Sequence, residues 1–164
     1  YLRWRQITKW ARIDLTGADL TDADLTYANL TGADLTYANL KYADLTYANL
    51  TDIRYNECTS FLALQCPEEG AFVGWKKCKN NVIVKLLIPE HAKRSSATSR
   101  KCRCSEAVVL DVYGAEYGVS EYDSRFHYHK GETVKVENFD ENRWVECSLG
   151  IHFFITRREA ELYN

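Results

Sequence analysis

Eight pentapeptides follow one another without interruption between residues 13 and 52, and this tandem repeat limits the possible folds more than any other feature. The segment reads IDLTG ADLTD ADLTY ANLTG ADLTY ANLKY ADLTY ANLTD. Each unit carries Asp or Asn at its second position and Leu at its third. A period of five fits neither a helical face, which repeats every 3.6 residues, nor the two-residue alternation of a strand. The pattern indicates a square coil in which each pentapeptide forms one side.

In such a coil the leucine and the small first residue of each unit point inward, because a narrow interior accommodates one Leu per side only beside a residue as small as Ala. Four units per turn place residues twenty apart above each other at strand spacing, about 4.8 Å. We therefore expect the stacked pairs Asn29–Asn49, Tyr27–Tyr47, Asp24–Asp44 and Asp14–Asp34. The expected interior contains eight leucines: Leu15, Leu20, Leu25, Leu30, Leu35, Leu40, Leu45 and Leu50.

The repeat resembles that of the pentapeptide-repeat family, whose motif is A(D/N)LXX. The resemblance implies a right-handed quadrilateral β-helix over residues 13–56, with about two coils. Repeats of a solenoid are stabilised only by their neighbours, so two coils need caps. Residues 1–12 predict an N-terminal cap or the remnant of an upstream coil, and residues 57–164 predict a separate domain that covers the other end. The outward Asp residues are either a functional acidic surface or, as we favour, solvated turn residues.

The region beyond residue 57 has the pattern of a small α+β domain dominated by strands. Residues 82–88, 105–113, 132–137 and 151–155 predict strands. Thr156, followed by Glu159 three residues later, predicts the capping box of a short C-terminal helix. The predicted fold class is therefore mainly β: a β-helix followed by a strand-rich α+β domain.

Several phrases of this region resemble a family of uncharacterised domains found after pentapeptide repeats in bacterial and phage proteins. They are FVGWKKC (72–78), IVKLLIPEHAKRSSATSRKCR (83–103), YHKGETV (128–134) and FDENRWVECSLGIHFFITRREA (139–160). The resemblance covers nearly all of residues 70–164. It implies an architecture but no activity.

Charge is segregated along the chain. Residues 13–52 contain seven Asp and one Lys, whereas residues 76–103 contain nine Lys or Arg and one Glu. No window is apolar enough to span a membrane, and no signal peptide is recognisable, so we expect a cytoplasmic protein without a membrane partner. Charge segregation of this kind usually reflects surfaces that face each other or a partner.

The segment 93–103 mixes cations with hydroxyl groups and predicts a candidate site for an anionic ligand or a nucleic-acid backbone. The alternative interpretation is a solvated loop, or a loop whose charges are matched by acidic groups of the same chain. The candidate anion-binding residues are Lys93, Arg94, Arg100, Lys101 and Arg103.

Six cysteines occur without any CxxC pair, so reduced and mostly buried thiols are expected. A zinc site that combines Cys102 and Cys104 with Cys78, Cys147 or His152 is the weaker alternative, and we predict neither a metal nor a cofactor. Candidate catalytic residues are His127, His152 and Cys147, because an imidazole near a thiol activates it. A hydrogen-bonded structural histidine is the favoured interpretation of His152.

The sequence leaves three hypotheses for function. The first is a non-enzymatic interaction module, in which the solenoid is a rigid spacer or docking surface and the C-terminal domain caps it and binds a partner, most simply another protein or a second copy of the chain. The second is an enzyme in the C-terminal domain, such as a transferase acting on a phosphate-bearing substrate. The third follows from the resemblance, because some pentapeptide-repeat proteins mimic duplex DNA and bind DNA gyrase; two coils, about 10 Å high, are short for that role.

Overall fold

The computed structural model describes residues 12–163, and over this range the chain is mainly β. It divides into two compact units. The first, called the repeat unit, comprises Tyr1–Leu64 together with Ala97–Ser99, and the second, called the C-terminal unit, comprises Gln65–Ser96 and Arg100–Asn164. The predicted cap in residues 1–12 lies outside the described residues except for Arg12. No helix in the described part of the chain is long and apolar enough to cross a membrane.

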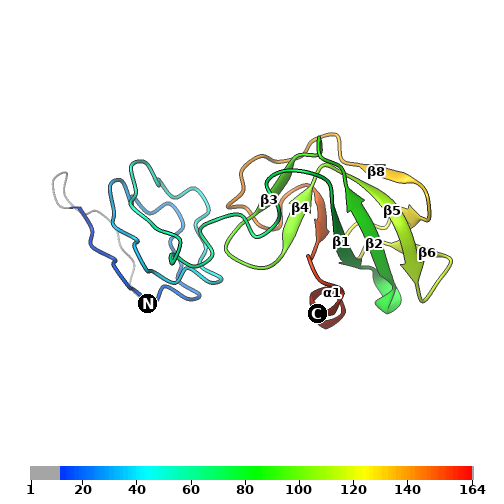
Figure 1. Cartoon of the computed structure of the whole chain (residues 1–164), viewed down its shortest axis with the longest axis horizontal. Helices are drawn as coiled ribbons and strands as arrows, with labels where there is room; N and C mark the ends of the chain where they lie inside the picture. Colours follow the sequence, from blue (N-terminus) through cyan, green and yellow to red (C-terminus); the bar gives the residue numbers. More distant parts are fainter. Residues whose placement is uncertain (1–11, 164) are drawn as a thin grey trace. The chain divides into compact units, whose positions relative to one another are not determined.

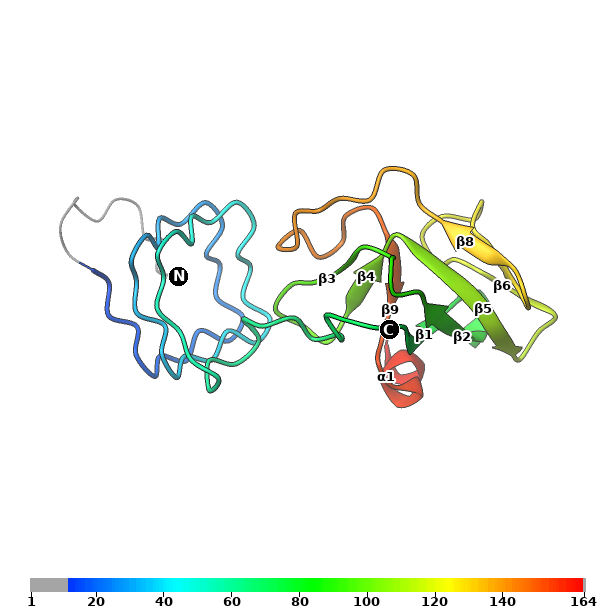
Figure 2. The ribbon, with the colours of Figure 1, turned by 45° about the horizontal axis from the view of Figure 1, so that its top comes forward.

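Parallel bridges between residues twenty apart organise the repeat unit, which winds in stacked loops without a helix (Figure 2). Asp14 pairs with Asp34 and Asn29 with Asn49, as the period predicted. Backbone hydrogen bonds accompany these bridges; for example, Leu15 N–H donates to Asp34 O at 2.8 Å. Four pentapeptides therefore bring the chain back to the same position, which confirms the expected stacking.

This layering continues beyond the last recognisable pentapeptide. Asp34 pairs with Arg54, and Asn39 pairs with Ser60, which is twenty-one residues away and so marks an insertion of one residue. Ser60 is held on both sides, because Leu40 N–H donates to its carbonyl and its own N–H donates to Ala38 O. The pentapeptide motif is no longer recognisable beyond residue 52, but the ladder of backbone hydrogen bonds continues to Ser60.

A tight turn with one residue in the left-handed region forms every corner of the repeat unit. The leucine carbonyl of each unit accepts from the backbone N–H three residues later, for example Ala18 N–H to Leu15 O at 3.0 Å. The fifth residue of all eight units has positive φ, between 57° and 69°. Positive φ at only the third position of a turn is the type II pattern. The corner residues are Gly17, Asp22, Tyr27, Gly32, Tyr37, Tyr42, Tyr47 and Asp52.

The leucines and alanines of the middle layers fill the interior. Leu35 and Leu40 have no exposed surface, and Leu25, Leu30 and Leu45 are also buried. Leu15, Leu20 and Leu50, which lie in the first, second and last units of the repeat, are half-buried. Burial is complete at Leu35 and Leu40, which follow the two residues, Asp34 and Asn39, that are bridged on both sides, as expected for a stack stabilised by nearest-neighbour contacts.

Nine strands in three antiparallel sheets form the C-terminal unit (Figure 1). The largest sheet has the order β1 (Phe72–Lys77), β2 (Ile83–Ile88), β5 (Glu106–Tyr113), β8 (Thr133–Lys135). The second contains β3 (Arg94–Ser96), β4 (Cys102–Cys104) and β9 (Ile151–Phe153), and the third contains β6 (Tyr117–Val119) and β7 (His127–His129). A 3-10 turn, η1 (Lys79–Asn81), joins β1 to β2.

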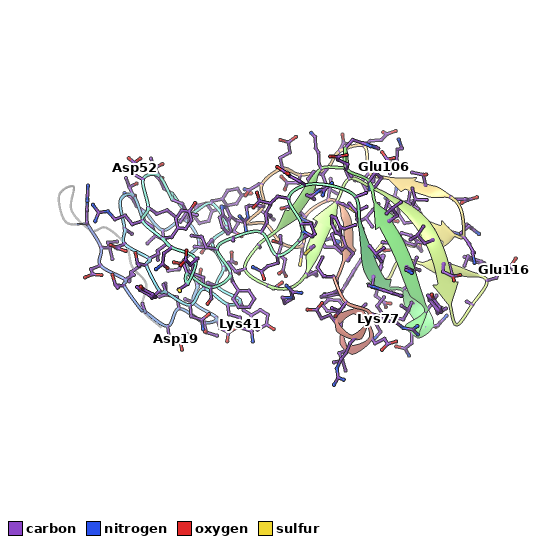
Figure 3. All side chains as sticks on the ribbon, in the orientation of Figure 1. Asp19, Lys41, Asp52, Lys77, Glu106 and Glu116 are labelled. Atoms are coloured by element: carbon purple, nitrogen blue, oxygen red, sulfur yellow. The ribbon has the colours of Figure 1, made fainter. Side chains whose placement is uncertain are left out.

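The sequence located four of these strands and the helix, and it missed β1, β3, β4, β6 and β7. β2, β5, β8 and β9 lie within the predicted ranges. The helix α1 (Arg157–Leu162) begins after Thr156, whose hydroxyl accepts from Glu159 N–H in the predicted capping box. In Figure 3 Lys77 lies beside α1, and its ammonium donates to Tyr163 O at 2.7 Å. Four of the missed strands, β3, β4, β6 and β7, have three residues each, which is too short to show periodicity in a sequence.

One apolar core lies under the sheets of the C-terminal unit. It combines alternate residues of β2, Val84, Leu86 and Ile88, with Phe153 of β9 and Tyr128 of β7. All five are at most 2% exposed. The core therefore draws on all three sheets and fixes their positions within the unit.

Candidate functional site

Four of the eight corner residues of the repeat unit are tyrosines with exposed side chains. Tyr27 is 75% exposed, Tyr37 60%, Tyr42 53% and Tyr47 59%. Tyr27 and Tyr47 stack as predicted, with ring centroids 5.1 Å apart and planes inclined by 25°. We call these four residues the tyrosine corners. Tyrosine is one of the residue types that are enriched in surfaces that bind proteins.

The tyrosine corners have a left-handed backbone conformation, which is unfavourable for a bulky side chain. Each has a φ between 57° and 62°, a region that costs a bulky residue of the order of 1–2 kcal/mol and that glycine occupies freely. Glycine does stand at the equivalent corners Gly17 and Gly32. Since glycine satisfies the turn, turn geometry alone does not explain the four tyrosines.

The acidic residues of the repeat unit have a local structural role. The Asp14 carboxylate accepts from Thr16 N–H at 3.0 Å, and the Asp19 carboxylate accepts from both the N–H and the hydroxyl of Thr21. These threonine hydrogen bonds lower the pKa of Asp14, Asp19 and Asp34. Asp19 and Asp52 lie at the periphery of the repeat unit in Figure 3, and both are exposed. The favoured interpretation, a solvated turn residue, fits these contacts.

Arg94 and Arg103 of the basic segment lie on strands and are directed at backbone carbonyls. Arg103 is 1% exposed, and its guanidinium donates to the carbonyls of Asp140, Leu149 and Asn142 at 2.8–2.9 Å. Arg94 donates to five carbonyls, among them Gly70 O and Pro89 O at 2.8 Å. Both side chains therefore hold loops of the C-terminal unit together through hydrogen bonds to their carbonyls.

The other three candidate cations pair with carboxylates. Lys93 contacts Glu141, Arg100 donates to Glu159 at 2.7 Å, and Lys101 lies 3.2 Å from Glu146. The acidic partners of all three cations, Glu141, Glu159 and Glu146, lie after residue 140 of the chain. Of the two interpretations of the basic segment, the contacts favour the one in which its charges are matched within the chain.

His152 is a half-buried, hydrogen-bonded side chain of β9. Its Nε2 lies 3.1 Å from Glu146 O, so the neutral imidazole donates to this carbonyl. Burial, together with the nearby cations Lys76, Lys101 and Arg103, lowers the pKa of His152 to about 4. His152 is therefore uncharged at neutral pH, in agreement with a structural histidine.

His127 lies in another sheet. It stacks on Tyr117 at 5.4 Å between ring centroids, and His129 stacks on the same tyrosine at 4.8 Å. His127 and His129 share a strand face, as their spacing on β7 predicted. The histidine candidates His127 and His152 are thus on different sheets, β6–β7 and β3–β4–β9.

Cys147 is exposed and contacts a lysine. Lys101 Nζ lies 3.2 Å from its sulfur and 3.4 Å from the Tyr163 hydroxyl. Burial opposes the charge of Lys101, but Glu146 and Cys147 together raise its pKa. The ammonium is therefore held beside the sulfur, where a cation stabilises negative charge. Within the described residues, 12–163, no group of three or more His, Cys, Asp or Glu side chains is placed to hold a metal ion.

Comparison with family models recognises both parts of the chain. Residues 13–52 match the model of pentapeptide repeats in eight copies. Residues 62–160, more than half of the chain, match a model described as a family of unknown function, DUF5758. The chain belongs to the DUF5758 family. This confirms the architecture inferred from the quoted phrases, a pentapeptide segment followed by an uncharacterised domain.

The other comparisons give no relative from which a role could be transferred. No protein with a curated description matches the chain significantly, and neither does any solved structure. The function of this DUF5758 protein has therefore to be argued from its own residues.

Two features of the DUF5758 protein were not fully predicted from the sequence. The Tyr27–Tyr47 stack was predicted, but the exposure of Tyr37 and Tyr42 was not, although Tyr stands at the fifth position of four of the eight units. The Lys101–Cys147 contact had no signal in the sequence, since the two residues are far apart in sequence and nothing in the pattern relates them.

Proposed function

We propose that the protein is a non-enzymatic interaction module whose repeat unit, a right-handed quadrilateral β-helix, presents the tyrosine corners to a protein partner. The observation that carries the proposal is four exposed tyrosines in a backbone conformation that glycine would adopt at lower cost. A strained, exposed residue repeated in one structural position is best explained by what its side chain contacts.

A protein partner fits the chemistry of this surface. Tyrosine buries a large area with little loss of conformational freedom and is enriched where binding energy is concentrated. The backbone ladder beneath the tyrosine corners holds their spacing, so the backbone loses little conformational entropy when a partner binds. The C-terminal unit has, in this proposal, a capping role and a binding role of its own.

The proposal is tested by site-specific photo-crosslinking in cells that naturally produce the protein. Benzoylphenylalanine is placed at Tyr37 or Tyr42, and the matched control carries it at Asp52. Asp52 occupies the same turn position, with φ of 57°, but it stacks on Gly32, so neither residue of that stacked pair is a tyrosine. We expect a discrete crosslinked protein from the two tyrosine positions and none from Asp52.

A quantitative test follows once the crosslinked protein is identified. The double variant Tyr37→Ser and Tyr42→Ser should weaken binding of that protein at least tenfold, because each aromatic contact at an interface contributes of the order of 1 kcal/mol or more. Equal crosslinking at Asp52, or unchanged affinity of the double variant, would exclude the tyrosine corners as the binding surface.

A further inference from the structure

Two histidines of β7 and a tyrosine of β6 form a cluster of stacked rings on the two-stranded sheet. Tyr117 lies directly opposite His129 in the antiparallel pair, and the centroids of these two rings are 4.8 Å apart with planes inclined by 22°. His127 stacks on the same tyrosine at 5.4 Å, with planes inclined by 10°. The three rings therefore lie in nearly parallel planes, and Tyr117 restricts the rotation of both imidazoles.

The spacing of the two imidazoles suits a shared metal ion. His127 and His129 are two residues apart on β7, so both side chains project from the same face of the strand. Their ring centroids are 6.1 Å apart, with planes inclined by 30°. The bond from a metal ion to an imidazole nitrogen is about 2.0–2.1 Å long, so two imidazoles that share one ion have their centroids roughly 5–6.5 Å apart. The observed separation lies within this range.

A backbone carbonyl fixes the tautomer of His127. Its Nε2 lies 3.0 Å from Ser124 O, and because a carbonyl only accepts, the neutral ring donates from Nε2 and keeps its lone pair on Nδ1. A histidine that binds a metal through one ring nitrogen almost always donates from the other nitrogen to a carbonyl, a carboxylate or water. His127 already makes the hydrogen bond that orients a metal ligand.

The cluster is open to solvent, and the charge of the neighbouring arginine is neutralised. His127 is exposed, His129 is half-buried, and Tyr117 is 40% exposed. Arg125, two residues before His127, lies 2.8 Å from the carboxylate of Asp123. A dication therefore reaches the imidazoles without approaching an unpaired guanidinium group.

We infer that His127 and His129 form a binding site for a divalent late first-row transition-metal ion, such as Ni²⁺, Cu²⁺ or Zn²⁺. Imidazole nitrogen suits these ions, whereas Mg²⁺ and Ca²⁺ take oxygen ligands. Two protein ligands are fewer than the three or four of a catalytic or structural zinc centre, so water fills the remaining positions and the ion is exchangeable. The site is distinct from the cysteine-based zinc site considered from the sequence, which predicted no metal at these histidines.

Proton NMR of the full chain, with Ni²⁺ as the probe, tests the site residue by residue. The chain contains four histidines, so their ring signals can be assigned with single His→Gln variants. The protein is produced without a histidine tag and carries Cys58→Ser and Cys147→Ser, because these two exposed thiols would also bind the ion. Paramagnetic Ni²⁺ broadens the signals of the protons that lie close to it.

We expect substoichiometric Ni²⁺ to broaden the ring signals of His127 and His129 together and to leave those of His91 and His152 sharp. His91 is the matched control, because its side chain is 72% exposed and lies outside the cluster, 3.4 Å from a carboxylate oxygen of Glu106. Equal broadening at His91, or broadening of only one histidine of β7, would overturn the assignment.

Calorimetric titration of three variants with Ni²⁺ extends the test. His127→Gln and His129→Gln should each weaken binding roughly tenfold or more, since even the loss of a group that only orients a ligand has an effect of this size. Tyr117→Phe, which keeps the stacked ring and removes the hydroxyl, should bind as the parent protein does. Unchanged binding in either histidine variant, or loss of binding in Tyr117→Phe, would contradict a site made of two imidazoles.

Discussion

At the scale of single residues, this chain places polar side chains where backbone groups need partners. Asp14 and Asp19 hold the turns that follow them. Arg103 saturates three carbonyls from one buried position. A buried polar group is tolerated only when its hydrogen bonds are made, and these residues show how a chain rich in charge keeps an ordinary core.

The stability of the C-terminal unit should fall between pH 6.5 and pH 4 because of His152. Its pKa is about 4 in the folded protein and about 6.5 in the unfolded chain, so on acidification the unfolded chain binds a proton that the folded protein does not. The stabilisation that comes from a neutral His152 is complete above pH 6.5 and is lost as the pH falls to 4. The free energy of unfolding decreases by about 3 kcal/mol at most.

Urea unfolding at a series of pH values measures this effect. His152→Gln, which retains a donor for Glu146 O, should have a flatter pH dependence across this window, and His127→Gln should behave as wild type. The C-terminal unit also has carboxylates with lowered pKa, whose contributions to stability are lost mainly below about pH 4.5; both proteins share them, so the difference between the two pH profiles isolates His152. They are Glu106, Asp111, Asp123, Asp140 and Glu159. Identical pH profiles for His152→Gln and wild type would contradict it.

The corner position predicts a cost for any side chain with a Cβ. Gly17 has φ of +66°, and a Cβ there would meet nothing within 4 Å. Gly17→Ala should therefore destabilise the repeat unit by about 1 kcal/mol through conformation alone, measured by thermal or denaturant unfolding. Gly17→Asn is the control, since Asn tolerates this region better, and an equal cost for both variants would point to a different cause.

At the scale of elements, close packing between β1 and β9 is the most demanding feature. A Cβ on Gly74 would lie 2.6 Å from Phe153 Cδ2 and 2.9 Å from Ile88 Cδ1, and both side chains are fully buried. Trp75 and Phe154, one residue further along each chain, exchange two backbone hydrogen bonds of 2.7 Å. The backbone cannot retreat without breaking them.

Gly74→Ala should consequently cost about 1–3 kcal/mol, the range for an overpacked core. Because the clash is mainly with the ring, Phe153→Leu should recover part of that loss in the double variant, although alone it is destabilising. The free energies of unfolding of the four proteins give the coupling between the two sites. Additive effects would show that the ring is not the obstacle.

At the scale of the whole molecule, three residues from late in the sequence complete the repeat unit. In the earlier layers a corner N–H donates to a carbonyl nineteen residues later, as Asp22 N–H does to Lys41 O. At Tyr42 the acceptor is instead Thr98 O, at 2.9 Å, and the Thr98 hydroxyl donates to Ala43 O. Ala97–Ser99 thus supply the hydrogen bonds that a further coil would have made.

A fragment of residues 1–64 should therefore be unstable on its own. It lacks Ala97–Ser99, so Tyr42 N–H and Ala43 O lose the partners supplied by Thr98, and an open edge of this kind promotes aggregation. Size-exclusion chromatography and circular dichroism measure the outcome, with the full chain as control. A monomeric, cooperatively melting fragment would show that the repeat unit needs no such completion.

The sequence alone determined the features that depend on near neighbours. Leucine every five residues fixed which side chains face inward and which residues stack, and Thr156 with Glu159 fixed where α1 begins. These patterns are readable because each residue interacts with others at a constant, short separation in the chain.

Only the tertiary structure decided the contacts between distant segments. The contacts of Thr98 with Tyr42, of Lys101 with Cys147 and of Arg103 with three carbonyls each join residues that no local pattern relates. Such contacts follow from how all the elements pack together, because a buried donor, thiol or charge takes whichever partner the completed fold brings within reach. For the same reason the sequence left two interpretations of the basic segment open, and the contacts of its cations with the protein's own carbonyls and carboxylates became visible only in the fold.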